Sequence, residues 1–289
     1  MKIHLVDGTY ELFRAHFGAP PKKSPSGMEV GATLGLLRSM LLLLSDPEVT
    51  HVAVAFDHVI ESFRNKMYAG YKTGAGVDPA LMAQFPLAEK AIAALGMVVW
   101  PMVKFEADDA IATAAARFKK VKSVEQIVIC SVDKDLTQMV DGQRVVCWDR
   151  RREIILDEKG VVEKFGVGPE SIPDFLALVG DSADGYLGIQ GWGEKSTATV
   201  LSKFKHIESI PNDPNNLGLG LGRATTLLGN LQQNYKEALL FRQLSTLRTD
   251  VPLKEKLSDL KWLGADERLN QVCKKLGDER IPERVSYWR

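Results

Sequence analysis

Apolar residues along this chain fall into two kinds of pattern, and these patterns outline the predicted elements. Short unbroken apolar runs, rich in β-branched residues, indicate strands that are buried on both faces. Longer segments with apolar residues three or four positions apart indicate helices. The strands are predicted at 3–7, 51–56, 98–100 and 126–131, and the helices at 30–45, 79–95 and 106–120. Because strands and helices alternate, we expect an α/β fold with a mainly parallel sheet and crossover helices.

The pattern changes after about residue 150. The run VVCWDRRREIIL predicts a β-hairpin, and from Glu170 onward the periodicity is mostly helical, with breaks rich in Gly and Asn. We therefore predict three parts: an α/β core over 1–169, a smaller helical subdomain over 170–255, and an extension over 256–289 that packs on the core. The extension carries a short amphipathic helical pattern around 266–277.

Composition narrows the class of protein. The chain has 289 residues, 45% of them hydrophobic, so it can bury a sizeable core. Lys and Arg equal Asp and Glu at 37 each, which argues against a generally basic nucleic-acid binder. Three scattered cysteines without a CxxC pair favour a reducing compartment over a disulfide or zinc framework. The apolar stretch 34–44 is too short to span a membrane and contains Arg38. A strand that starts at Lys2 leaves no room for a signal peptide, so we expect a soluble cytoplasmic protein with no membrane partner.

Carboxylates recur at the ends of segments that are predicted as strands. Parallel strands bring their C-terminal ends to one edge of a sheet, so acids that lie far apart in the sequence can meet there. Many negative charges share a small volume only if cations neutralise them, and oxygen-only ligation indicates Mg²⁺ or Mn²⁺. The nine candidate metal ligands are Asp7, Asp57, Glu106, Asp108, Asp109, Asp133, Asp135, Asp181 and Asp184.

Each of these acids also has a purely structural interpretation. Asp7, which precedes a glycine, and Asp57 can close turns, and the acids of Glu-Ala-Asp-Asp at 106–109 can cap a helix. For a single acid such roles are the commoner ones. When the nine acids are considered together, the structural interpretation becomes weaker, because turns and caps do not need an acid at every strand end. Clusters of this kind can hold two ions about 4 Å apart, the arrangement used for in-line phosphoryl displacement.

A glycine-rich segment follows the last two acids. In GDSADGYLGIQGWGEKSTATV, glycines at 188, 191 and 193 precede a predicted helix that starts at Glu194. Such a turn offers free N–H groups to a phosphate, and Lys195 can add positive charge. A plain helix–turn–helix corner is the competing interpretation. The segment is not a P-loop, because the required Gly-Lys-Ser/Thr is absent.

A basic and aromatic segment precedes the loose TGAG sequence. In FRNKMYAGYKTG, three cations (Arg64, Lys66 and Lys72) alternate with three rings (Phe63, Tyr68 and Tyr71). Cations for phosphates and rings for unstacked bases suit single-stranded or frayed nucleic acid. A solvated loop with a few packed aromatic residues explains the same pattern equally well.

The order of these motifs resembles the 5′-nuclease domain of bacterial DNA polymerase I and the wider flap endonuclease family. The resemblance runs over about residues 1–255, through VDGTYELFR, FDHVIESFRNKMYAGYK, EADDAIAT, SVDKDLTQ, LVGDSADGYLGIQGWGEKSTA and FRQLSTLRTDVPL. No polymerase or proofreading region follows, so the chain looks like a standalone form. The resemblance implies a PIN-like fold, with a central, mostly parallel sheet flanked by helices and a helix–hairpin–helix subdomain at about 175–205.

The resemblance also implies an activity. Members of the family hydrolyse phosphodiester bonds at 5′ flaps, nicks and 5′ ends of DNA in replication and repair. Two divalent ions are implied, one for the five acids from Asp7 to Asp109 and one for the four acids from Asp133 to Asp184. Lys72, assisted by Arg64, would neutralise the scissile phosphate. The implied DNA contacts are Gly188, Gly191, Gly193, Lys195, Ser196, Tyr68 and Tyr71, with a K⁺ ion at the hairpin. A monomer associated with the nucleoid is expected.

The sequence departs from the family pattern at two places, and other classes of protein have to be weighed. Position 75 is Ala where Tyr-Lys-x-x-Arg is usual, so one cation over the phosphate is missing. Asp184-Gly185-Tyr186-Leu187-Gly188 replaces Asp-Asn-x-Pro-Gly, which predicts a looser loop around Asp184 and a weaker second metal site. A catalytically inactive protein that binds branched DNA is the main alternative. A phosphatase or toxin-type ribonuclease is disfavoured by the segment 181–198, and a redox or nucleotide-cofactor enzyme by the lack of a suitable motif.

Overall fold

The computed structural model describes residues 1–18 and 20–289, which divide into two compact units. Unit 1 comprises Met1–Ser62, Gly74–Ser131 and Arg248–Arg289, and unit 2 comprises Phe63–Thr73 and Val132–Leu247. Each unit is therefore assembled from segments that are distant in the sequence. No helix in these described residues is long and apolar enough to cross a membrane.

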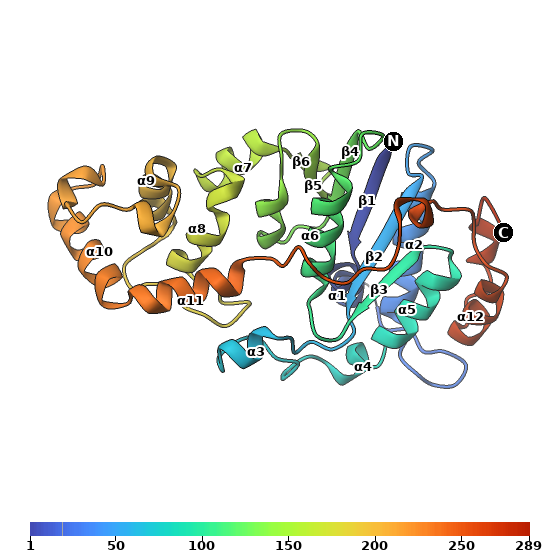
Figure 1. The fold of residues 1–289 in the computed structure, drawn as a ribbon. Helices are drawn as coiled ribbons and strands as arrows, with labels where there is room; N and C mark the ends of the chain where they lie inside the picture. Colours follow the sequence, from blue (N-terminus) through green and yellow to red (C-terminus); the bar gives the residue numbers. More distant parts are fainter. Residues whose placement is uncertain (19) are drawn as a thin grey trace. The chain divides into compact units, whose positions relative to one another are not determined.

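Unit 1 is built on four parallel strands in the order β3-β2-β1-β4 (Figure 1). The strands are β1 Lys2–Asp7, β2 His51–Asp57, β3 Val98–Met102 and β4 Gln126–Cys130. In β1, Leu5 lies opposite Ala53 on one side and Ile129 on the other, and all three side chains are fully buried. This confirms the four strands that the apolar runs predict, with the central ones buried on both faces.

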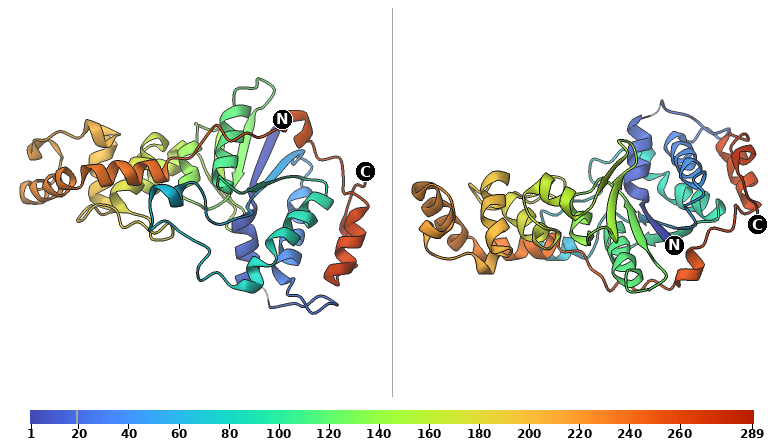
Figure 2. Two further views of the ribbon diagram at one scale, coloured as in Figure 1. Left: turned by 60° about the horizontal axis from the view of Figure 1, so that its bottom comes forward. Right: turned by 90° about the horizontal axis from the view of Figure 1, so that it is seen from above.

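Helices cover both faces of this sheet (Figure 2). On one face α6 packs against β1, β2 and β3, and its many small Ala side chains allow a close approach. On the other face α1 and α5 pack against β2, α2 packs against both of these helices, and α12 packs against α5. The helices of unit 1 are α1 Gly8–Gly18, α2 Gly31–Leu44, α4 Pro79–Met82, α5 Phe85–Ala94, α6 Ala107–Phe118 and α12 Arg268–Leu276.

Helix α1 is a departure from the sequence prediction, in which Asp7-Gly8 forms a turn. The strand β1 instead passes into α1 without a loop, because Gly8 is the first helical residue. A Cβ atom at Gly8 would lie 2.6 Å from the Phe56 ring, so only glycine lets the start of the helix approach the end of β2. The predicted helix over 79–95 is also two helices, α4 and α5, and Asp78 caps the first of them.

The last segment of the chain runs along unit 1. The amide N–H of Trp262 donates to the Thr50 carbonyl (2.8 Å), and its indole N–H donates to the Leu95 carbonyl (2.9 Å). A Cβ atom at Gly96 would lie only 2.0 Å from the Gly264 carbonyl oxygen, so the two backbones are in direct contact. These contacts lie at the N-terminal ends of β2 and β3, at the edge of the sheet opposite Asp7 and Asp57.

Unit 2 contains a β-hairpin and a group of helices. The hairpin pairs β5 and β6 in antiparallel fashion, as the sequence predicts, and the segment after Lys134 is a 3₁₀ helix, η1, that packs on β5. Helix α8 packs on both α9 and α11. The elements are α3 Arg64–Met67, η1 Asp135–Met139, β5 Val145–Asp149, β6 Ile154–Leu156, α7 Glu158–Phe165, α8 Ile172–Val179, α9 Glu194–Phe204, α10 Leu221–Gln233 and α11 Tyr235–Ser245.

Candidate metal and DNA-binding site

In unit 1, Asp7 and Asp57 stand at the C-terminal ends of neighbouring strands. The Asp7 carboxylate accepts a hydrogen bond from the Tyr10 amide (2.9 Å) and another from the hydroxyl of Ser131 (2.8 Å), the residue after β4. The Asp57 carboxylate accepts one from the amide of Ala107, the first residue of α6 (2.7 Å). These bonds bring the ends of β1, β2 and β4 and the start of α6 to one edge of the sheet, where the sequence places the acids.

The three acids at the start of α6 differ in their surroundings. Glu106 is the N-cap residue, is 3% exposed, and accepts a hydrogen bond from the Ser62 hydroxyl (2.6 Å). Asp109 is fully buried, and its two oxygens accept hydrogen bonds from the backbone amides of Glu106 (3.0 Å) and Arg248 (2.9 Å). Asp108 is half-buried. The capping geometry supports a structural role for Asp109, because both of its carboxylate oxygens already accept hydrogen bonds from backbone amides.

In unit 2, Asp133 and Asp135 flank Lys134, and Asp135 is the first residue of η1. Asp133 is exposed and accepts a hydrogen bond from the Asp135 amide (2.9 Å), which shapes a tight turn. Asp135 is 6% exposed, and its Oδ1 atom is buried without a hydrogen-bond partner. The ammonium group of Lys134 reaches Asp181 Oδ2 (2.9 Å), so this turn is linked to the loop that follows α8. That loop follows the helix α8 and not a strand, so Asp181 and Asp184 do not stand at a strand end.

Asp184, the last acid of the second group, is 7% exposed and is held by the segment 70–72. The Lys72 ammonium lies 3.0 Å from Asp184 Oδ1, and the Tyr71 hydroxyl donates to Asp184 Oδ2 (3.2 Å). The Lys72 amide donates to the Asp184 carbonyl (3.0 Å). Side chain and backbone of Asp184 are thus both fixed by residues more than a hundred positions earlier.

The expectation of a loosened loop at 184–188 is wrong. Gly185 adopts a φ of 86°, and a Cβ atom there would lie 2.2 Å from the Gly70 carbonyl oxygen. Tyr186 is fully buried and exchanges two backbone hydrogen bonds with Asp181 (2.8 and 3.0 Å). A glycine at position 185 therefore permits a close backbone contact that a residue with a side chain would prevent.

The electrostatics of this group favour a cation. Burial raises the pKa of Asp135 well above its usual value, and the charges of Asp133, Asp184 and Asp181 raise it further. Burial alone would lower the pKa of Lys134, but its bond to Asp181 and the neighbouring acids outweigh burial and raise it. A buried carboxylate oxygen without a partner, beside three further acids, is explained by a cation that binds there. The residues present therefore fit a divalent ion.

Side chains must still rotate for a metal ion to bind. Among residues 1–18 and 20–289, no three His, Cys, Asp or Glu side chains already surround one point at which a metal ion could sit. In both groups the acids are instead engaged by backbone amides, hydroxyls or lysines. Metal binding thus competes with these internal bonds.

Three of the residues predicted to contact DNA or phosphate are buried, and two of them, Arg64 and Tyr71, are held by hydrogen bonds within unit 2. Arg64 is 1% exposed, and its guanidinium donates to the carbonyls of Leu244 (2.7 Å) and Thr246 (3.2 Å) at the end of α11. Tyr71 is 3% exposed and bonded to Asp184. In this structure Arg64 thus supports the C-terminal end of α11 and Tyr71 supports Asp184, and their contacts with DNA or phosphate stay predictions. Tyr68 is half-buried, with its ring edge-on to Phe241.

The glycine-rich turn joins α8 to α9, as the helix–hairpin–helix prediction requires. Gly188 has a φ of 71°, and a Cβ atom there would lie 2.4 Å from the Gly180 amide, so the turn packs directly on the end of α8. Gly193 is the N-cap of α9, and Lys195 is exposed in the first turn. Ser196 is instead buried and donates to the Gly193 carbonyl (3.0 Å). The exposed start of α9 and Lys195 are thus available to a phosphate, whereas Ser196 supports the turn.

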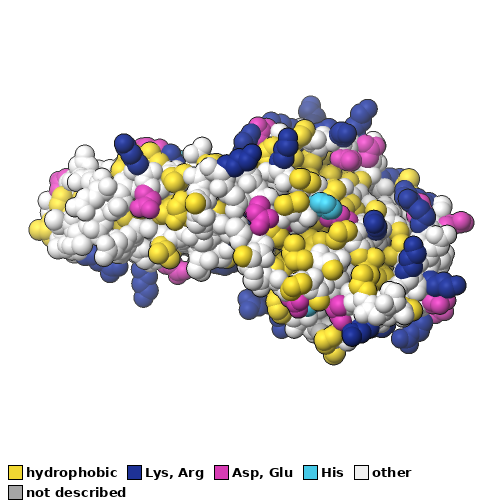
Figure 3. Space-filling model, turned by 90° about the horizontal axis from the view of Figure 1, so that it is seen from below, with side chains coloured by type: hydrophobic (Ala, Val, Ile, Leu, Met, Phe, Trp, Pro, Cys, Tyr) yellow, Lys and Arg dark blue, Asp and Glu magenta, His cyan; other side chains and the backbone are white. Residues whose placement is uncertain are grey.

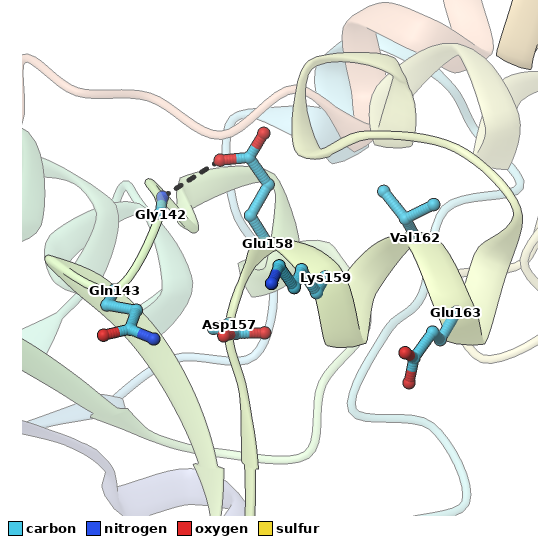
Figure 4. Close-up of a pocket in the computed structure, with 7 residues that line it drawn as sticks. All are labelled: Gly142, Gln143, Asp157, Glu158, Lys159, Val162 and Glu163. Carbon is cyan, nitrogen blue, oxygen red and sulfur yellow. Dashed lines mark hydrogen bonds between the residues drawn. The ribbon is translucent and has the colours of Figure 1, made fainter.

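The hollow shown in Figure 4 lies elsewhere in unit 2 and contains none of the predicted site residues. Its volume is about 550 Å³. Glu158 on its wall accepts a hydrogen bond from the Gly142 amide (3.1 Å), and Asp157 caps α7 by accepting one from the Gly160 amide (3.0 Å). Asp157 and Glu158 therefore have structural partners, whereas the Oδ1 atom of Asp135 has none. It is lined by Gly142, Gln143, Asp157, Glu158, Lys159, Val162 and Glu163.

Sequence reasoning overlooked the supporting residues of both groups. The sequence does not predict the roles of Ser131 and Asn65. Nor does it predict the ion pair between Lys134 and Asp181, although Lys134 stands between two predicted acids. The amide of Asn65 donates to the Lys72 carbonyl (2.9 Å) and so fixes the backbone beside the predicted catalytic lysine. The position of Lys134 within Asp-Lys-Asp was the available signal.

Two family models match consecutive parts of the chain. Residues 2–166 match the model described as 5′-3′ exonuclease, N-terminal resolvase-like domain, and residues 167–268 match 5′-3′ exonuclease, C-terminal SAM fold. The chain belongs to the 5′-3′ exonuclease family. It is a nuclease by family, and the predicted fold class is confirmed. The models meet three residues before the predicted boundary at 169, which itself stays a prediction.

Similarity to individual proteins supports the same family assignment. The chain is 32% identical to the 5′-3′ exonuclease of Aquifex aeolicus over 262 residues, 90% of this chain and 89% of the relative. It is 31% identical to DNA polymerase I of Bacillus caldotenax over 98% of this chain, but spans only 32% of that protein. Its fold is similar to that of the bacteriophage T5 flap endonuclease, solved as a pseudo-enzyme–product complex with DNA and metal ions. For that structure the TM-score is 0.65 and the identity 17%, over 98% of this chain and 96% of that one.

Proposed function

We propose that this nuclease acts on DNA at 5′ flaps, nicks and 5′ ends, with two divalent ions, Mg²⁺ or Mn²⁺, held by its two groups of acids. The observation that carries the proposal is Asp135, a buried carboxylate with one unpartnered oxygen beside Asp133, Asp181 and Asp184. A structural role would not leave that oxygen unbonded, whereas ligation of a cation explains it. The T5 structure, with its DNA and metal ions, supports the same assignment by likeness of fold.

The ligands proposed for the first ion are Asp7, Asp57, Glu106 and Asp108, with Asp109 in support of the α6 start. Those for the second are Asp133, Asp135, Asp181 and Asp184. When bound, the ions would activate water and stabilise negative charge on the phosphate. Lys72, 28% exposed at its side chain, would leave Asp184 and contact the scissile phosphate.

The helix–hairpin–helix turn is proposed to bind the duplex part of the substrate. The free N–H groups at the start of α9 and the ammonium of Lys195 would contact backbone phosphates without reading the base sequence. On the face shown in Figure 3, Lys and Arg side chains are spread among Asp and Glu and not gathered in one large patch. On this face, phosphates would therefore meet single basic side chains and not a broad basic surface. The K⁺ ion at the hairpin, the monomeric state and the nucleoid-associated cytoplasmic location stay predictions.

The test is cleavage of DNA labelled in the 5′ strand, offered as a flap, a nicked duplex and a blunt duplex. We expect cutting at or near the junction with Mg²⁺ or Mn²⁺ and none with EDTA. Cutting that continues in excess EDTA would contradict the proposed use of metal ions. Tight junction binding without cutting in any metal would instead favour the branched-DNA-binding alternative.

A further inference from the structure

The ion pair between Lys134 and Asp181 has a consequence for metal binding, which rests on the proposed function. Lys134 lies between two proposed ligands, yet its ammonium group reaches across to a third, Asp181 Oδ2, at 2.9 Å. The Asp181 side chain is 6% exposed and that of Lys134 is 37% exposed, so the carboxylate is shielded from water and the ammonium group is partly exposed. Burial of the carboxylate makes the attraction stronger than that of a pair exposed at both ends.

The net charge of the acids in unit 2 and their two neighbouring lysines indicates how many metal ions this group can bind. Four carboxylates (Asp133, Asp135, Asp181 and Asp184) lie near two ammonium groups, those of Lys72 and Lys134. With all four carboxylates ionised, two net negative charges remain, which one divalent ion neutralises. Each lysine occupies an oxygen of another acid, whereas Asp135 Oδ1 is buried without a hydrogen-bond partner and is a candidate ligand for that ion.

We propose that Lys134 is a built-in competitor of the second metal ion. In the DNA-free protein it holds Asp181, and its positive charge repels the incoming ion, so that it keeps the affinity of this group for divalent ions low. Lys72 acts in the same way on Asp184, but is also proposed to contact the phosphate. No contact with the phosphate is proposed for Lys134, so substitutions of Lys134 test the competition with the metal ion without removing a catalytic group.

The opposite interpretation is that Lys134 is only a staple that keeps the 181–186 loop in place. The loop has other supports: the paired backbone bonds between Asp181 and Tyr186, and the bond from the Ile189 amide to the Leu178 carbonyl (2.8 Å). The two interpretations predict opposite signs. A competitor, when removed, raises metal affinity, whereas a lost staple would disorder the ligands and lower it.

The experiment is a titration of the full-length, DNA-free protein with Mn²⁺, followed by calorimetry and by the EPR signal of free Mn²⁺. For Lys134→Met we expect the dissociation constant of the weaker class of sites to fall about tenfold, because one positive charge near a divalent ion is lost. Lys134→Arg keeps the charge and should bind like wild type. An unchanged or weaker affinity in Lys134→Met would overturn the proposal.

Two controls make the effect specific. Lys159→Met removes a lysine beside Asp157, Glu158 and Glu163 in the hollow of Figure 4, and should leave Mn²⁺ binding unchanged. In an Asp181→Asn background, Lys134→Met should have a smaller effect, because no Asp181 carboxylate is left to be released and only the charge repulsion is removed. An equal gain from Lys159→Met, or an undiminished gain in the Asp181→Asn background, would overturn the proposal. If Lys134→Met leaves the Mn²⁺ affinity unchanged while the wild-type protein cleaves flaps, only this inference fails. If the wild-type protein neither binds Mn²⁺ nor cleaves flaps, the proposed function fails.

Discussion

Tyr71 and Arg64 show how the surroundings of one position decide what a side chain does. Cations and rings in alternation predict contact with nucleic acid, yet both of these side chains are buried and bonded within their own chain. Their partners, Asp184 and the end of α11, lie more than a hundred positions away. The sequence predicts the acids because their residue type matters by itself. It does not predict their supports, because those depend on long-range folding.

The support of Asp184 by Tyr71 predicts a graded defect. Tyr71→Phe keeps the buried ring and removes only the hydroxyl that donates to Asp184 Oδ2 (3.2 Å). We expect flap cleavage to fall about tenfold, the usual effect of losing a group that orients a metal ligand, with little change in thermal stability. The measurement is single-turnover cleavage as a function of Mg²⁺ concentration. Cleavage equal to wild type at limiting Mg²⁺ would contradict the positioning role.

Gly185 predicts a defect of stability. In Gly185→Ala the new Cβ atom would lie 2.2 Å from the Gly70 carbonyl oxygen, at a backbone φ of 86° that is strained for alanine. We expect a loss of about 1–3 kcal/mol in the free energy of unfolding, measured with urea. The matched control is Gly229→Ala in α10, where a Cβ atom meets nothing within 4 Å. It should be neutral or stabilising, and an equal loss in both variants would contradict the close-contact argument.

Strands and helices differ in how well the sequence predicts them. The four parallel strands can be predicted from the sequence, because burial on both faces requires an unbroken apolar run. Helix α1 is not, because Asp7-Gly8 has the chemistry of a turn and only the approach of Phe56 explains the glycine. The segment Asp135–Met139, for which no strand or helix is predicted above, forms the 3₁₀ helix η1, which is too short to give a periodic signal in the sequence.

The link between α2 and the end of α12 predicts a dependence of stability on pH. Asp278, 5% exposed, accepts a hydrogen bond from Arg38 on α2 (2.5 Å), with Lys22 at 3.5 Å. Burial alone would raise the pKa of Asp278, but the bond and charge of Arg38 and the charge of Lys22 outweigh it and lower the pKa. The stabilisation is therefore present above the pKa of the unfolded chain and is lost as pH falls through the lower folded value.

Asp278→Asn should accordingly lower the free energy of unfolding by about 1 kcal/mol at pH 7, since Arg38 is partly exposed. The difference from wild type should shrink as pH falls below about 4. Urea titrations at pH 7, 5 and 3.5 check this, with Glu279→Gln, an exposed carboxylate next to Asp278, as the control. A difference that grows toward acid pH would contradict the assigned ion pair.

For the chain as a whole, the sequence predicts that acids at strand ends meet at one edge of the sheet, but it does not predict how the chain divides into units. Unit 1 is closed by the segment Arg248–Arg289, and unit 2 includes the distant segment Phe63–Thr73. Boundaries drawn from a change of pattern along the sequence assume continuous parts, which neither unit is. The even balance of 37 basic and 37 acidic residues likewise hides where charge is concentrated, because the acids of unit 2 lie together beside two lysines.

The central claim is that the acids of unit 2 serve hydrolysis and not folding or DNA binding alone. The most direct measurement compares Asp135→Asn with Asp157→Asn, an acid of the same unit that only caps α7. With enzyme in excess over a 5′-labelled flap in Mg²⁺, Asp135→Asn should cut about a hundredfold more slowly or not at all, yet bind the flap within a few-fold of wild type. Asp157→Asn should cut like wild type. Cutting by Asp135→Asn at the wild-type rate would contradict the account.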